Sequence, residues 1–161
     1  MAGADRYELR DSRPADFRRL WQIDQICFAP GIAYSQRELA YYMKMRGAFT
    51  IVAVKSASAA EVRGGKGVVG FVVGQILARG LGHVVTIDVM PEVRRAGLGT
   101  LLMNECEARL RAAGCRAVYL ESAVDNEPAL RFYKLHGYSV LKTIPRYYMN
   151  TIDALMLGKN L

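Results

Sequence analysis

The chain has 161 residues, of which 52% are apolar and 23% are charged, and these values suit one globular domain with a substantial core. Lys and Arg number 22 against 15 Asp and Glu, which gives a net charge of +7. The basic residues are spread along the chain without a block of interleaved aromatic residues, so we expect no direct binding to nucleic acid. An anionic ligand accounts for part of the charge, and a basic surface would also steer the protein toward ribosomes.

No segment approaches the roughly 18 uninterrupted apolar residues of a membrane span, and the N-terminus has no apolar region that resembles a signal peptide. Cys27, Cys106 and Cys115 are an odd number without C-x-x-C spacing, which argues against a disulfide framework and against a zinc site. We therefore expect a single domain over residues 1–161, in the cytoplasm, with no membrane segment and no metal.

The first part of the chain predicts a strand followed by two helices. Residues 7–10 predict a short strand, and Pro14 opens a helix that Pro30-Gly31 ends. Residues 35–38, Ser-Gln-Arg-Glu, have the form of a capping box that starts a second helix, to about residue 45. The connection between the helices is aromatic at both ends, with Phe28 and Tyr34, which suit packing at least as well as binding.

Residues 49–55 and 68–77 predict two further strands. The stretch between them, residues 56–67, is rich in Ser and Ala and then in Gly. We interpret it as a mobile hairpin loop that is longer than most, and we assign it no function.

The stretch from Val84 to Leu110 predicts a strand, a turn and a helix, and the rest of the chain is arranged around it. The helical part has one apolar stripe, whereas Glu107 and its charged neighbours fall largely on other faces. The residues of the stripe are Leu98, Leu102, Cys106, Leu110 and Ala113.

The turn over residues 94–100, Arg-Arg-Ala-Gly-Leu-Gly-Thr, is suited to bind a phosphate or diphosphate. The first N–H groups of a helix are unpaired and lie at the positive end of the helix dipole. Its glycines allow a ligand to lie against the main chain, and its arginines add positive charge. A plain solvated turn has the same composition, and neither a Walker loop nor a G-x-G-x-x-G pattern is present.

Residues 117–122 predict a strand with Glu121 near its C-terminal end, where ligands of open α/β sheets usually bind. Asn126 is suited to cap the next helix, which ends near His136. Asn126 and Tyr133 are seven positions apart, so they share one helix face and can point at the same ligand.

Three other titratable residues have no assigned role. Asp88, inside an apolar strand, either faces a bound acceptor or is paired structurally. His83 and His136 each suit a surface or turn position better than the role of a base.

Two motifs resemble those of one family. Residues 89–99 resemble the acetyl-CoA signature of the GNAT superfamily of N-acetyltransferases, which is Gln/Arg-x-x-Gly-x-Gly/Ala after a strand, with matches at Arg94, Gly97 and Gly99. Residues 126–138 resemble the second motif, Asn-x-x-Ala followed by a Tyr and a Gly-Phe/Tyr pair. The resemblance runs from about residue 7 to the C-terminus and is strongest over residues 84–148.

The resemblance implies an α/β (α+β) fold, in which a mixed, strongly twisted sheet of six to seven strands is split at the central strand and has helices on both faces. It also implies an N-acetyltransferase with acetyl-CoA as donor and CoA as product. The residues that would hold this cofactor are Val89, Met90, Arg94, Arg95, Ala96, Gly97, Leu98, Gly99, Thr100 and Asn126.

Acetyl transfer to an amine needs a base, an oxyanion donor and an acid for the departing thiolate. Glu121 resembles the catalytic glutamate of the ribosomal-protein-alanine type of N-terminal acetyltransferase. The Leu-Glu of that family's Leu-Glu-Val-Arg matches here, and the Val-Arg is replaced by Ser-Ala. Tyr133 matches the family's general acid near the CoA sulfur. By the same resemblance, the N–H of Val89, at a bulge in the central strand, would polarise the thioester carbonyl.

Arg146-Tyr147-Tyr148 resembles the segment with which protein N-terminal acetyltransferases hold the first residues of a peptide, although tyrosines beside a strand are also often cross-strand packing. Phe28 and Tyr34 lie in the loop that shapes the acceptor site in this superfamily. We therefore expect the N-terminal α-amine of a protein or peptide as acceptor, with a ribosomal protein among the candidates, and a monomer or weak dimer. The alternatives are a small amine (polyamine, amino sugar or amino acid) and a CoA-binding regulatory module without turnover; Glu121 and Tyr133 together argue against the module.

Overall fold

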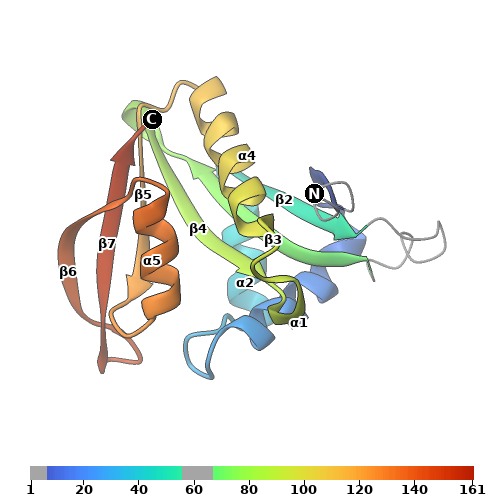
Figure 1. Cartoon of the computed structure of the whole chain (residues 1–161), viewed down its shortest axis with the longest axis horizontal. Helices are drawn as coiled ribbons and strands as arrows, with labels where there is room; N and C mark the ends of the chain where they lie inside the picture. The colour runs from blue at the N-terminus through green and yellow to red at the C-terminus, as the bar shows by residue number, and fades with distance from the viewer. Residues whose placement is uncertain (1–6, 56–66) are drawn as a thin grey trace.

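The computed structural model describes residues 7–55 and 67–161, and the predicted loop over residues 56–67 lies, except for Gly67, outside them. The described residues form a seven-stranded sheet with the order β1-β2-β3-β4-β5-β7-β6 (Figure 1). The strands are β1 (Tyr7–Asp11), β2 (Ala48–Lys55), β3 (Val68–Ile76), β4 (Leu81–Val89), β5 (Ala117–Ala123), β6 (Ser139–Tyr148) and β7 (Ile152–Asn160). The helices are α1 (Phe17–Cys27), α2 (Gln36–Lys44), α4 (Leu98–Ala112) and α5 (Glu127–Leu135), with short 3-10 turns at Pro14–Asp16, Ala78–Gly80 and Pro91–Val93.

Helices cover both faces of the sheet, as the family resemblance implies. Alternate residues of a strand point to opposite faces, and in β2 both sets are buried. Ile51 and Ala53 pack in a core cluster with α4 and α5, whereas Val52 and Val54 pack in a second cluster with α1 and α2. Figure 1 shows α4 crossing one face of the sheet and α1 and α2 on the other.

The sheet is split beside its central strand β4. All neighbouring strands pair antiparallel except β4 and β5, which run parallel and pair only between residues 81–83 and 117–119. Beyond His83 and Tyr119 the two strands separate, which confirms the predicted split. In the C-terminal halves of β4 and β5, the backbone N–H and C=O groups on the edges that face the split are therefore not paired with a neighbouring strand.

Local signals placed the helices correctly. The Ser35 side chain accepts a hydrogen bond from the Glu38 N–H and the Glu38 side chain accepts one from the Ser35 N–H, so the predicted capping box is present. Cys106, on the inner face of α4, is fully buried in the core, as expected. Two details of the helical stripes are wrong: Ala113 is exposed at the end of α4, whereas Glu107 is buried. In the described residues, no helix is both long and apolar enough to cross a bilayer.

Candidate active site

The predicted anion-binding turn leads from β4 into the N-terminus of α4. Gly97 caps the helix with a left-handed backbone (φ 79), and Arg95 is left-handed as well (φ 65). No side chain caps this end of the helix. The hydrogen bond from the Leu101 N–H to the Gly97 carbonyl, at 3.1 Å, is the one that closes the first turn. The N–H groups of residues 98–100 are therefore available to an anion at the positive end of the dipole.

The two glycines of the turn serve different purposes. A Cβ built on Gly97 would meet no atom within 4 Å, whereas one on Gly99 would lie 3.2 Å from the Phe132 ring of α5. Gly97 is thus required by its backbone conformation and leaves open space for a ligand, and Gly99 also allows α5 to approach. Arg94 donates from Nε to the Val89 carbonyl at 2.9 Å, which ties the turn to the end of β4.

Val89 is the last residue of β4, and its predicted position at a bulge is wrong. The register shift between β3 and β4 lies at Val85, and Val89 pairs regularly with Gly70. The Met90 N–H donates to the Val69 carbonyl at 2.9 Å, and successive residues of a strand direct their N–H groups to opposite edges. The Val89 N–H therefore points to the edge from which β5 has departed. Its availability arises from the split of the sheet and needs no bulge.

Glu121 lies two residues beyond the last β4–β5 pair, at the point where the strands separate. Its Oε2 is 2.7 Å from Nε2 of His83, and the two side chains are only 14% and 16% exposed. The His83 ring also stacks on Tyr119, with centroids 4.3 Å apart. His83 is therefore a half-buried strand residue, and its predicted surface or turn position is wrong. Sequence offered no signal for this pair, because it depends on the register of two strands 38 residues apart in the chain.

Tyr133 lies on α5 among aromatic rings. It packs edge-on against Phe132 and Tyr138, with ring centroids 5.6 and 6.0 Å away. Its hydroxyl has no hydrogen-bond partner among the described side chains. Burial raises the pKa of Tyr133 far above its usual value, with a further contribution from the charge of Asp88, so the phenol stays protonated. Asn126 caps the same helix, with Oδ1 accepting from the Ala129 N–H at 3.3 Å.

Tyrosine side chains from distant segments converge around Glu121. Tyr34, from the α1–α2 connection, has its ring centroid 5.0 Å from that of Tyr42 on α2. Tyr147 and Tyr148, at the end of β6, meet edge-on at 4.8 Å. Burial followed by the nearby Glu121 charge raises the pKa of Tyr147 to about 12. Burial also raises the pKa of Tyr42 and Tyr148, and the Glu121 charge adds to both shifts. The predicted Tyr147 and Tyr148 therefore lie near Glu121, and the predicted Tyr34 joins them through its contact with Tyr42. Tyr42 was not among the predicted site residues.

The two segments that carry these tyrosines, the α1–α2 connection and the β6–β7 turn region, are in contact. A Cβ built on Gly31, in the α1–α2 connection, would overlap the Met149 sulfur in the β6–β7 turn. Arg146, also predicted to contact the acceptor, has an exposed side chain and a left-handed backbone (φ 53), and its N–H donates to Asp153 at 2.9 Å. Phe28 is partly buried, and its N–H donates to the Asp24 carbonyl at 3.1 Å.

Asp88 is buried with an exposure of 1%, so it does not face a solvent-filled acceptor site. Its Oδ1 accepts a hydrogen bond from the Thr86 hydroxyl at 2.6 Å. The question left open by sequence is therefore answered in favour of a structural pairing.

Comparison with known proteins identifies the family. The family model described as "Acetyltransferase (GNAT) family" matches residues 16–138, more than half of the chain. The chain belongs to the acetyltransferase (GNAT) family. The family resemblance seen in the two motifs is thereby confirmed.

Individual relatives agree with this assignment. An N-alpha-acetyltransferase of Sulfurisphaera tokodaii is 38% identical over 78 residues, which are 48% of this chain and 47% of the relative. Ard1 from Thermoplasma volcanium superposes with a TM-score of 0.82 at 24% identity over 96% of this chain and 97% of its own. The ribosomal-protein-S18-alanine N-acetyltransferase of Escherichia coli superposes with a TM-score of 0.78 at 18% identity, over 96% and 93% of the two chains. The structural likenesses establish the GNAT fold, and the chain spans about half the length of the curated relatives it matches.

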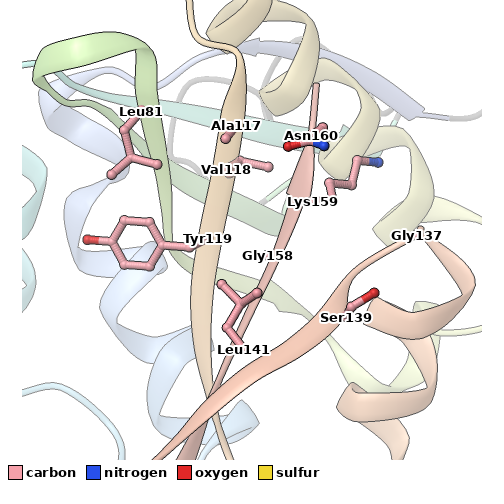
Figure 2. A pocket seen from close by; sticks show the side chains of 10 residues that line it. All are labelled: Leu81, Ala117, Val118, Tyr119, Gly137, Ser139, Leu141, Gly158, Lys159 and Asn160. Atoms are coloured by element: carbon pink, nitrogen blue, oxygen red, sulfur yellow. The ribbon is translucent and has the colours of Figure 1, made fainter.

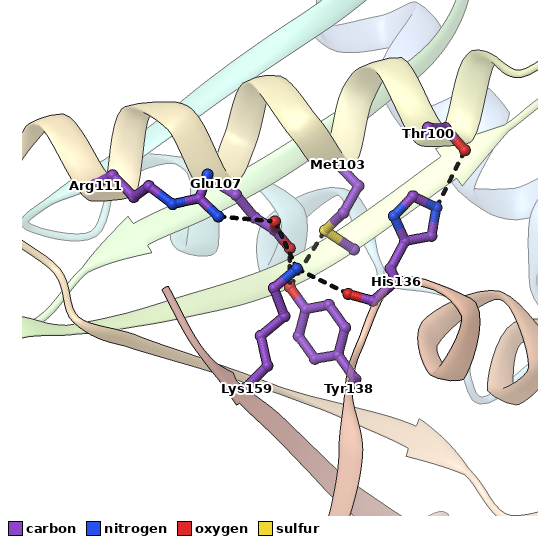
Figure 3. Close-up of polar contacts among 7 residues, drawn as sticks. All are labelled: Thr100, Met103, Glu107, Arg111, His136, Tyr138 and Lys159. Atoms are coloured by element: carbon purple, nitrogen blue, oxygen red, sulfur yellow. Dashed lines mark hydrogen bonds and ion pairs between the residues drawn. The ribbon is translucent and has the colours of Figure 1, made fainter.

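A buried polar network holds α5 of the GNAT fold against α4 (Figure 3). Glu107 accepts from the Tyr138 hydroxyl and from Lys159 Nζ, both at 2.8 Å. Lys159 also donates to the carbonyl of His136, at the C-terminus of α5. The His136 ring in turn lies 3.1 Å from the Thr100 hydroxyl in the first turn of α4. The network therefore joins the helix that carries Tyr133 to the anion-binding turn.

A pocket of about 560 Å³ lies elsewhere, at the paired ends of β4 and β5 (Figure 2). Its lining includes Leu81, Tyr119 and Leu141 and contains none of the predicted site residues. Because it lies where the strands are still paired, it is separate from the split at which Glu121 is found.

Proposed function

We propose that the protein transfers the acetyl group of acetyl-CoA to the N-terminal α-amine of a protein or peptide. The observation that carries the proposal is the Glu121 carboxylate, which is hydrogen-bonded to His83 at the split of the sheet. Tyr42 from one half of the fold and Tyr147 and Tyr148 from the other lie near enough to feel its charge. A carboxylate bordered by aromatic rings suits an ammonium group on an extended peptide.

Bound acetyl-CoA would supply an activated acetyl thioester and a diphosphate anchor. The N–H groups of residues 98–100, with Arg95 beside them, suit the diphosphate, because they combine unpaired donors with the positive end of the helix dipole. The Val89 N–H, on the free edge of β4, would donate to the thioester oxygen as negative charge develops there.

Glu121 would accept the proton of the ammonium group, directly or through a water molecule, so that the amine becomes a nucleophile. His83, 2.7 Å away, would hold the carboxylate in one orientation. Tyr133 would then donate its hydroxyl proton to the departing thiolate. The phenol is protonated at neutral pH, as a proton donor must be.

The side of the site that would hold the acceptor is built in a way that favours a peptide over a small amine. Tyr34, Tyr147 and Tyr148 come from two segments that meet through Gly31 and Met149. Tyrosines arranged in this way can donate hydrogen bonds to successive peptide carbonyls and form an apolar wall. The Sulfurisphaera tokodaii relative is named an N-alpha-acetyltransferase, and the Escherichia coli neighbour is named for an alanine of a ribosomal protein, which makes an alanine-starting ribosomal protein one candidate acceptor.

The test is a screen with acetyl-CoA in which release of the CoA thiol is measured. One set holds short peptides with different first residues, an alanine-starting peptide among them, and a second set holds polyamines, amino sugars and free amino acids. Each accepted peptide is repeated with a blocked N-terminus and a free internal lysine. We expect thiol release with free N-termini only. Release with small amines but with no peptide would overturn the proposal.

A further inference from the structure

Two buried carboxyl groups face each other beneath the acceptor side. Asp24 of α1 is fully buried and Asp88 of β4 is 1% exposed. Each has one oxygen that accepts a hydrogen bond: Asp24 Oδ2 from the Tyr34 N–H at 2.7 Å, and Asp88 Oδ1 from the Thr86 hydroxyl at 2.6 Å. The other two oxygens, Asp24 Oδ1 and Asp88 Oδ2, are buried and have no hydrogen-bond partner among residues 7–55 and 67–161.

Two ionised carboxylates in this arrangement would be very unfavourable, because burial removes their solvation and their charges repel. Asp24 lies one helical turn before Cys27, whose thiol donates to the carbonyl of Val89, the neighbour of Asp88, at 3.4 Å. The two carboxyl groups are therefore neighbours across the contact of α1 with β4, and each affects the pKa of the other. One shared proton would satisfy both free oxygens with a single O–H···O bond and leave the pair with one negative charge. Burial and the charge of Asp24 raise the pKa of Asp88 well above its usual range, so Asp88 is the member that carries the proton.

The Asp24–Asp88 pair is connected to the proposed acceptor site through the backbone of Tyr34. The Asp24 carboxylate accepts the Tyr34 N–H, and the Tyr34 carbonyl accepts from Trp21 Nε1 at 3.1 Å and from Gln25 Nε2 at 2.6 Å. All these partners lie on α1. The position of the Tyr34 ring beside Tyr42 therefore depends on the attachment of the loop to α1, and through Asp24 on the contact of α1 with β4.

We propose that Asp24 and Asp88 share one proton and act as a positioning pair, which holds the Tyr34 segment of the acceptor wall against the end of β4. Loss of the proton would leave two buried carboxylates that repel, and α1 with its attached loop would move away from β4. The consequence for turnover rests on the proposed peptide site, whereas the shared proton does not.

Other charged and titratable groups face the pair. Arg94 lies near Asp88 from the α4 turn and favours its ionised form, and Cys27 of α1 and Tyr133 of α5 lie close enough for a charge on Asp88 to raise their pKa values. Glu38 of α2 raises the pKa of Asp24. Apart from Arg94, none of these groups supplies a compensating positive charge, so a proton between the carboxyl groups is the available means of neutralising one of them.

The matched variants are Asp88→Asn and Asp24→Ala. In Asp88→Asn the amide can donate to Asp24 and still accept from Thr86, which reproduces the singly protonated pair. Asp24→Ala removes the acceptor of the Tyr34 N–H. We expect Asp88→Asn to keep the peptide KM of the wild type and Asp24→Ala to raise it about tenfold, the cost of one buried unsatisfied donor, with the acetyl-CoA KM unchanged in both. Circular dichroism of each variant identifies any that fails to fold.

Two readouts separate a shared proton from a merely structural contact. Wild-type turnover should fall at alkaline pH relative to Asp88→Asn, and the ratio of the two profiles cancels the titration of the amine and of Glu121. Independently of any acceptor, the infrared spectrum of the wild type should contain a protonated-carboxyl band that shifts in D2O and is missing in Asp88→Asn. The proposal is overturned if that band is absent from the wild type, or if Asp88→Asn and Asp24→Ala raise the peptide KM equally. Failure of every peptide with the band intact would instead overturn the proposed function.

Discussion

At the residue scale, the position of Glu121 is defined by where strand pairing stops. The last β4–β5 pair joins His83 to Tyr119, so Glu121 is the first residue on the same face of β5 that extends beyond it. Its hydrogen bond to His83 and its 14% exposure hold the carboxylate at the split. A carboxylate that is held in one orientation at the split can meet the proton of a bound ammonium group, whereas a freely rotating surface glutamate has no fixed position.

Glu121→Gln keeps the shape of the side chain and removes the base. We expect turnover on an accepted peptide to fall by about a hundredfold or more near neutral pH. The deficit should shrink as the pH rises, because the free amine, with a pKa near about 8, becomes abundant without help. Thiol release across the range from about pH 6 to 9 measures this. Glu8→Gln, an exposed change on β1, is the control. Nearly full activity of Glu121→Gln at every pH would make Glu121 structural.

Tyr133→Phe removes only a hydroxyl group from a packed ring. We expect turnover to decrease by about ten to a thousandfold, within the range of general acid catalysis, with little change in acetyl-CoA affinity. The ring contacts with Phe132 and Tyr138 persist, so stability should hardly change. Single-turnover rates and calorimetric binding test the two expectations, with the exposed Tyr41→Phe as control. If the rate is unaffected, another group or water protonates the thiolate.

At the element scale, α4 presents the anion-binding turn and also fixes the position of α5. Its N-terminus begins at a left-handed Gly97 without a side-chain cap, and its buried middle contributes Glu107 to the network in Figure 3. One helix therefore connects the cofactor end of the proposed site to the helix that carries the general acid. The anion-binding turn is tested by a change at Gly97, and the link to α5 is tested by a change at Glu107.

Gly97→Glu should abolish acetyl-CoA binding, because a carboxylate at the helix N-terminus would repel the diphosphate and occupy its place. Gly114→Glu is a matched control. Gly114 also has a positive φ, +91, and a Cβ there would also meet nothing within 4 Å, but it lies at the opposite end of α4. Backbone strain is therefore similar in both variants, and only Gly97→Glu should lose binding by calorimetry. Undiminished affinity in Gly97→Glu would contradict the assignment of the turn.

Glu107→Gln should destabilise the fold by about 3 kcal/mol, because it leaves Lys159 largely buried without its charge partner. Urea denaturation measures the loss. Glu105→Gln, on the same helix, breaks only an exposed pair with Arg109 and should change stability by about 0.5 kcal/mol or less. The double variant Glu107→Gln/Lys159→Met should recover part of the stability. Equal effects of the two glutamine changes would show that burial of the pair is unimportant.

At the scale of the whole molecule, the site lies between two halves of one sheet that are joined by few strand pairs. The half from β1 to β4 carries α1, α2 and the anion-binding turn, and the half from β5 to β6 carries Glu121 and the Tyr147-Tyr148 segment. On the acceptor side, the halves meet again where Gly31 packs against Met149. Contact at that point would position the Tyr34 loop relative to the Tyr147-Tyr148 segment.

Gly31→Ala should raise the peptide KM and leave the acetyl-CoA KM unchanged, because its Cβ would overlap the Met149 sulfur and its φ of +88 disfavours any side chain. Steady-state kinetics with both substrates varied measures the separation. Gly31→Ala/Met149→Ala removes the overlap but keeps the backbone strain, so it should restore part of the affinity for the peptide. An unchanged peptide KM in Gly31→Ala would mean that the loop–turn contact does not shape the acceptor side.

Local sequence determined the features that depend on neighbouring residues. The strand-turn-helix over residues 84–110, the capping box at Ser35 and the cap at Asn126 follow from backbone geometry and short-range hydrogen bonds, and all are present. The family, the split sheet and the helices on both faces followed from motifs whose residues are close in the chain.

Only the tertiary structure determined which distant side chains meet. The contact of His83 with Glu121 depends on the parallel register of β4 and β5, and the pairing of Asp24 with Asp88 depends on how α1 packs on the sheet. The sequence around Glu107 is that of an exposed helix position, yet Lys159 of β7 and Tyr138, just before β6, cover it. Helical and strand periodicity describe one element at a time. The partners of a buried charge come from other elements, so the periodicity of its own element leaves them undetermined.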